Sequence, residues 1–77
     1  MSRTSTSPVT TGALLFGGDW ACAHGDLEAL SYVAELLSDR VSEPFRLELL
    51  ELAQLCRRDQ DLAARRWPPL RGRLGTA

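Results

Sequence analysis

The stretch from Asp26 to Cys56 is dense in leucine and is apolar on more than one side of each helix that it can form. A helix needs only one apolar stripe to dock on a small core, yet both helices predicted here carry a second, smaller apolar set. The main stripes are Leu27, Leu30, Ala34 and Leu37, and then Phe45, Leu49, Leu52 and Cys56; the second sets are Ala29, Tyr32 and Leu36, and then Leu47 and Leu50. These stripes require more neighbouring surface than a chain of 77 residues readily supplies.

The boundaries of these two helices follow from their capping residues. Asp26 is a suitable N-cap for a helix over 27–38, because its carboxylate can accept a hydrogen bond from a free N–H group of the first turn. Ser42 is predicted to cap a second helix over 44–57. Pro44 then falls in the first turn, where its missing N–H costs little.

A further helix is expected after the second one. Asp59 or Asp61 can cap a helix over 61–67. We expect the Pro68-Pro69 pair to interrupt this helix, or to restart it as a short final helix over 68–74. The reason is that proline removes a backbone donor and its ring clashes with the preceding turn.

The N-terminal part is expected to hold little regular structure. Residues 1–12 are rich in Ser and Thr and are predicted to form a flexible tail before a single helical domain over 13–74. An apolar patch over 13–16 lies between glycines, which argue against a stable helix. The patch is expected to be a strand, a strained helical turn or a segment that docks across the core. A short helical run over 20–24, capped by Asp19, is expected to follow it. The glycines concerned are Gly12, Gly17 and Gly18, and Gly25 is expected to end the run in the left-handed conformation.

The expected fold class is all-α, either a small bundle of three or four helices or a pair of helical hairpins. Asp26-Leu27-Glu28-Ala29 recurs as Asp61-Leu62-Ala63-Ala64, at an offset of 35 residues. The run from Gly25 to Leu30, followed by Tyr32 and Ala34, resembles the start of the second helix of a tetratricopeptide repeat, whose period is close to this offset. It lacks one residue between the acid and the Ala-Leu pair. The resemblance implies two tetratricopeptide-like hairpins over about residues 13–74.

Either architecture would bury one stripe of each helix. The second apolar sets would then meet either the N-terminal apolar segment or a partner, because exposed together they exceed what a monomer usually shows. The expected core consists of Leu30, Val33, Ala34, Leu37, Phe45, Leu49, Leu52 and Leu62.

The net charge of −1 conceals a segregation of charge along the chain. Residues 19–51 carry eight acids against two arginines, whereas residues 52–77 carry six arginines against two acids. The basic end permits a nucleic-acid-binding regulator as an alternative function, although Asp59 and Asp61 lie among its arginines and oppose phosphate. The candidate nucleic-acid contacts are Arg57, Arg58, Arg65 and Arg66.

The residue types that perform catalysis are sparse and poorly spaced. Cys22 and His24 form a single loose pair that would point apart on a helix, whereas zinc ligands usually come in Cys or His pairs separated by about two to five residues. Cys56 lies on an apolar stripe, where cysteine behaves as a small hydrophobic residue. We therefore expect no metal site, no cofactor, no catalytic residue and no enzymatic activity.

The compartment is inferred from what the sequence does not contain. The early apolar run is too short for a signal peptide, and no span approaches the length of a transmembrane helix. Two cysteines are too few for a disulfide framework. A cytoplasmic location is expected, and the use of arginine without lysine is typical of a GC-rich bacterial genome.

The surplus apolar faces are the main functional indication in the sequence. They predict a non-enzymatic protein-interaction module, an adaptor or small chaperone, that binds a helix of a partner; self-association is the nearest variant. The layout is similar to that of small tetratricopeptide-like chaperones of bacterial secretion systems. Tryptophan and arginine are enriched at interfaces, so Trp67 joins the set. The predicted partner-binding residues are Tyr32, Leu36, Leu47, Leu50 and Trp67.

Overall fold

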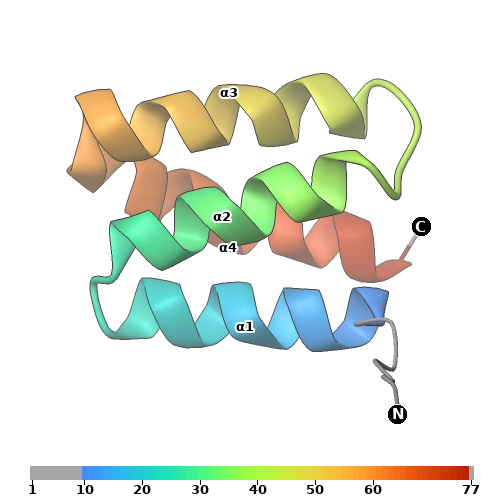
Figure 1. The fold of residues 1–77 in the computed structure, drawn as a ribbon, viewed down its shortest axis with the longest axis horizontal. Coiled ribbons are helices and arrows are strands. Elements are labelled where there is room, and N and C mark those ends of the chain that lie inside the picture. Colours follow the sequence, from blue (N-terminus) through green and yellow to red (C-terminus); the bar gives the residue numbers. More distant parts are fainter. Residues whose placement is uncertain (1–9, 77) are drawn as a thin grey trace, which may run out of the picture.

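The computed structural model describes residues 10–76 and shows four helices joined by short connections (Figure 1). Successive helices run in opposite directions along the long axis. The all-α class expected from the sequence is confirmed. The helices are α1 (Thr11–Ala23), α2 (Leu27–Ser38), α3 (Phe45–Arg58) and α4 (Gln60–Thr76).

The order of the helices around the core is that of a closed four-helix bundle. Each helix packs on the next along the chain, and α4 returns to pack on α1. Across the diagonals, α2 touches α4 lightly, and no contact joins α1 to α3 within the described residues. Two stacked hairpins would instead set α1 against α3. The bundle, and not the tetratricopeptide-like layout, is therefore the alternative that the structure shows.

The predicted caps of α2 and α4 are present. The Asp26 carboxylate accepts a hydrogen bond from the Ala29 N–H at 3.1 Å, and Gly25 before it has a φ of +69°. The Asp59 carboxylate accepts from the Leu62 N–H at 3.2 Å. The predicted cap of α3 is wrong, because this helix begins at Phe45 without a side-chain cap.

The N-terminal segment is helical where little structure was expected. Thr10 caps α1 by accepting from the Ala13 N–H at 3.0 Å, so the helix includes the last two residues of the predicted tail and the region around Asp19. Residues 1–9 of that tail lie outside the described residues. The glycines cost helix propensity, roughly 1 kcal/mol each, and the burial of Leu14 and Leu15 in the core offsets that cost.

The proline pair does not divide α4, which corrects the predicted break into helices over 61–67 and 68–74. Pro68 has no N–H to donate to the carbonyl of Ala64, four residues earlier. The Cys22 thiol of α1 donates to that carbonyl instead, with a sulfur–oxygen distance of 3.4 Å. A neighbouring helix thus supplies one donor that the proline removes.

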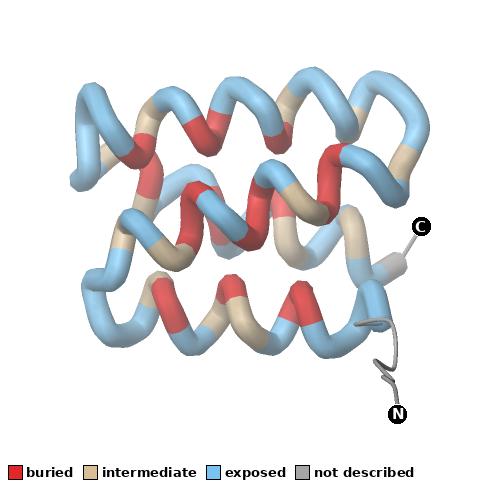
Figure 2. Tube along the Cα trace, in the orientation of Figure 1, coloured by how far each residue is buried: buried red, intermediate tan, exposed pale blue. Residues whose placement is uncertain are grey.

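The core lies along the axis of the bundle, and each helix turns its buried residues inward (Figure 2). Six of the eight predicted core residues are buried, while Phe45 and Leu62 are half-buried. The sequence prediction took Leu62 alone from α4 and no residue from α1. The buried residues it missed include Leu14, Leu15, Ala21, Ala63, Trp67 and Leu70.

Trp67 anchors α4 to α1. Its side chain is 1% exposed, and its indole N–H donates to the Asp19 carboxylate at 2.8 Å. Arg71, one turn further along α4, donates to the other oxygen of the same carboxylate at 3.1 Å. The ring lies directly against Gly18, where any Cβ would come within 3.0 Å of three ring atoms.

This contact predicts that Gly18→Ala lowers the free energy of unfolding by about 1–3 kcal/mol, because overpacking against a buried indole outweighs the gain in helix propensity. Gly72→Ala on α4 is the matched control. Apart from its chain neighbours and the backbone of its own helix, no atom lies within 4 Å of its added Cβ, so this variant should gain about 0.5–1 kcal/mol. Urea unfolding of the two variants measures the difference, and equal stabilisation by both would contradict the prediction.

Candidate protein-interaction surface

The structure separates the five predicted partner-binding residues into three groups. Tyr32, Leu47 and Leu50 are exposed, with 64%, 54% and 37% of their surfaces accessible. Leu36 is half-buried and packs against the core. Trp67 is a core residue, so its assignment to the interaction surface is corrected. Its indole is buried in the core and donates a hydrogen bond to the partly exposed Asp19 carboxylate.

Two exposed aromatic residues were missed by the sequence analysis. Phe16 and Trp20 of α1 are 71% and 51% exposed. Their spacing of four residues places them on one side of a helix. The spacing was visible in the sequence, but it had no meaning until the glycine-rich segment was known to be helical.

A groove of about 530 Å³ lies between α2 and the junction of α3 with α4. Tyr32 lines it, whereas Leu47 and Leu50 do not. The groove therefore joins only part of the predicted surface. Its lining mixes apolar, acidic and basic side chains from Leu27, Glu28, Ser31, Glu35, Cys56, Arg57 and Gln60.

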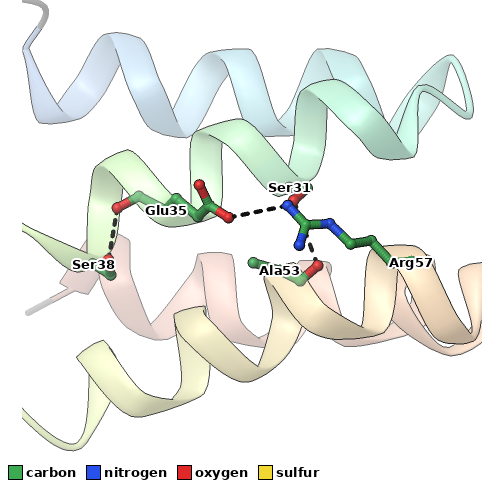
Figure 3. Close-up of polar contacts among 5 residues, drawn as sticks. All are labelled: Ser31, Glu35, Ser38, Ala53 and Arg57. Carbon is green, nitrogen blue, oxygen red and sulfur yellow. Dashed lines mark hydrogen bonds and ion pairs between the residues drawn. The ribbon is translucent and has the colours of Figure 1, made fainter.

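Beside this groove, α2 and α3 approach closely over two small residues (Figure 3). The buried Ser31 hydroxyl donates to the Ala53 carbonyl of α3 at 3.5 Å. Arg57 extends over this contact and donates to Glu35 at 3.4 Å. The Ser38 hydroxyl donates back to the Glu35 carbonyl at 2.6 Å. The Ser31–Ala53 contact therefore joins the two helices where a large residue would separate them, whereas the Ser38 hydrogen bond lies within α2.

The four arginines of the alternative function do not form one free cationic surface. Arg57 pairs with Glu35, and Arg66 pairs with Glu51 at 3.2 Å. Arg65 donates through Nε to the Asp61 carbonyl at 3.5 Å. Arg58 is exposed, and no ion pair reaches it in the part of the chain that the structure describes. Two of the four charges are thus partly neutralised by acids.

The cysteines and the single histidine make contacts with the backbone or the core. Burial raises the pKa of the Cys22 thiol, and the nearby Asp19 carboxylate raises it further. Burial likewise raises the pKa of Cys56. His24 stacks on Trp20 with ring centroids 4.2 Å apart, and its Nδ1 lies 2.8 Å from the Trp20 carbonyl oxygen. Raised thiol pKa values disfavour the thiolate that a nucleophile requires.

Over residues 10–76, no group of three or more Cys, His, Asp or Glu side chains has an arrangement that could hold a metal ion. None of the described helices combines the length and the apolar character needed to cross a membrane.

No protein-family model, curated protein or solved structure matches this chain.

The contact between Cys22 and the Ala64 carbonyl predicts a structural role for this thiol. Cys22→Ala removes the donor and should lower the free energy of unfolding by about 1 kcal/mol. Cys22→Ser keeps a donor of similar size and should lose less. Urea unfolding compares the two variants, and an equal loss in both would show that the thiol contributes packing alone.

The ion pair between Glu48 of α3 and Arg73 of α4 predicts a pH-dependent part of stability. The hydrogen bond from Arg73 lowers the pKa of Glu48 below its ordinary value of 4.5. The folded state therefore binds this proton less readily than the unfolded state, so the contribution is present above about pH 4.5 and is lost as the pH falls through the lower, folded-state value.

Thermal unfolding from pH 7 to pH 2 should show the wild type more stable than Glu48→Gln at neutral pH. The two profiles should converge in acid. Added salt should reduce the difference at neutral pH, because both side chains are partly exposed. Parallel profiles over the whole range would contradict the prediction.

Proposed function

We propose that this protein is a non-enzymatic interaction module, an adaptor or small chaperone, that holds an amphipathic helix of a partner protein against α2 and α3. The observation that carries the proposal is the exposure of Tyr32, Leu47 and Leu50 outside a core that is already closed. The bundle buries the main stripes of α2 and α3 between α1 and α4. A large part of these three side chains therefore stays exposed after folding, and large exposed apolar residues are typical of interaction surfaces.

The surroundings of Tyr32 favour a partner helix of a particular chemistry. Glu28 and Glu35 lie one turn before and one turn after Tyr32 on α2 and line the same groove. Arg57 already pairs with Glu35, whereas Glu28 has no ion pair in the described region. An apolar anchor beside Tyr32 with a basic residue near Glu28 would suit this surface.

The proposal is tested by affinity capture from the native host with three forms of the full chain. Wild type should enrich a partner. The double variant Tyr32→Glu with Leu47→Glu should reduce that enrichment at least tenfold. Arg65→Glu is the matched control, because it places the same charge on an exposed position of α4. It should retain the partner.

The opposite pattern would favour the nucleic-acid alternative and overturn the proposal. In that case Arg65→Glu would abolish binding, the double variant would not, and the wild type would be retained on DNA at low salt. A steep loss of DNA affinity with added salt would then be expected.

A further inference from the structure

One side of α1 is an uncharged strip of exposed residues. Ala13, Phe16, Trp20 and Ala23, spaced by three, four and three residues, lie on this side and are all exposed. The spacing is that of the seam along which two helices pack. We call these four residues the α1 strip.

The rest of α1 explains why the strip is free of charge. Asp19 is the sole charged residue of this helix. Its carboxylate is turned toward α4, where it accepts hydrogen bonds from Trp67 and Arg71. The opposite sides of α1 pack on α2 and α4. A helix that is apolar on nearly all sides is usually buried on nearly all sides, yet the α1 strip has no cover within the described residues.

The α1 strip is complementary to itself. Its residues are placed symmetrically about position 18, since Ala13 and Ala23 lie five residues to either side, and Phe16 and Trp20 lie two. In an antiparallel pair of α1 helices, each Phe16 would face Trp20 of the second copy, and each Ala13 would face Ala23. Aromatic pairs would then occupy the centre and small residues the ends. A two-fold interface requires this match of a surface with itself.

Electrostatics also favours the antiparallel arrangement. The first turn of α1 contains no acid, and its last turn contains no basic residue, so neither end of its dipole is neutralised by its own side chains. An antiparallel pair places the positive end of each helix beside the negative end of the other. Because the α1 strip carries no charged side chain, pairing also desolvates no ion.

The stack of His24 on Trp20 restricts the motion of one of the two aromatic side chains at the centre of the α1 strip. The two rings lie 4.2 Å apart and within 21° of parallel. The stack limits the orientations of an indole that is otherwise half-exposed. Less conformational freedom is then lost when the indole enters an interface.

We infer that the α1 strip is the interface of a two-fold dimer of this chain, in which two α1 helices pack antiparallel about position 18. The strip is about 15 Å long, because ten residues separate Ala13 from Ala23 and each adds 1.5 Å of helix rise. Such an interface belongs to the small class below about 1,200 Å². The dimer is therefore reversible and forms with increasing protein concentration. It leaves the proposed surface on α2 and α3 free.

Sedimentation equilibrium over a wide concentration range tests the dimer. Wild type should pass from monomer to dimer, and Phe16→Glu should remain monomeric at the concentration where most of the wild type is dimeric. Leu47→Glu is the control, because it adds the same charge to an exposed apolar position of α3. It should dimerise like the wild type. Equal melting temperatures of dilute Phe16→Glu and wild type would show that the fold is intact.

Three results would overturn the inference. The wild type could stay monomeric at every concentration. This result would overturn the inference even if Phe16→Glu failed to bind another protein of the host. Phe16→Glu could dimerise as the wild type does. Leu47→Glu alone could abolish the dimer, which would place self-association on the surface proposed for a partner and leave the α1 strip without a role.

Cysteine cross-linking tests the antiparallel register separately. In a Cys22→Ser background, Ala13→Cys and Ala23→Cys chains are mixed and treated with a short bis-maleimide. The mixture should give cross-linked dimers, because positions 13 and 23 face each other. Ala13→Cys alone should give few, because its two copies lie about 15 Å apart along the helix axis. Efficient linking within Ala13→Cys alone, with no gain on mixing, would overturn the antiparallel arrangement.

Discussion

The contact of Trp67 with Gly18 and Asp19 determines how the bundle closes. Three helices in sequence form an open layer, and the fourth must pack back on the first to bury their common face. The indole fills that space because residue 18 has no side chain, and Asp19 accepts its N–H. Arg71 binds the same carboxylate. A small residue, the acid beside it and a facing tryptophan therefore join the first helix to the last.

The bounds of α2 were predictable because they depend on local chemistry, whereas α3 has no side-chain cap and was located by its apolar periodicity. Asp26 and Gly25 act within one turn of the residues that they organise, so the bounds of α2 follow from the sequence. The outer helices depend on residues distant in the chain. Gly18 is unfavourable in an isolated helix and necessary against Trp67, and Pro68 is tolerated beside a donor from α1. Helix propensity alone could not predict that Gly18 and Pro68 lie within helices, since both are accommodated by the contact between α1 and α4.

The same division explains the interaction surface. Tyr32, Leu47 and Leu50 lie on helices whose buried and exposed faces could be predicted from the spacing of apolar residues. All three are exposed. Trp67 was assigned to that surface because tryptophan is common at interfaces, but its environment is set by a helix that the sequence analysis did not expect. Phe16 and Trp20 were missed for the same reason. A residue can be placed on a face only after its element has been recognised.

The leucine-rich centre of the sequence predicts that the exposed apolar residues lie on α2 and α3. In the structure, exposed apolar residues lie on α1 as well. Part of the second apolar set on α2 packs against the core, as the half-buried Leu36 shows. Among the large apolar residues of the described region, Phe16 has the largest exposed fraction, and it lies in a segment where little regular structure was expected. A short bundle that buries Trp67 inside has little volume left for other aromatic rings. Phe16 and Trp20 consequently lie outside, where only another surface can remove them from water.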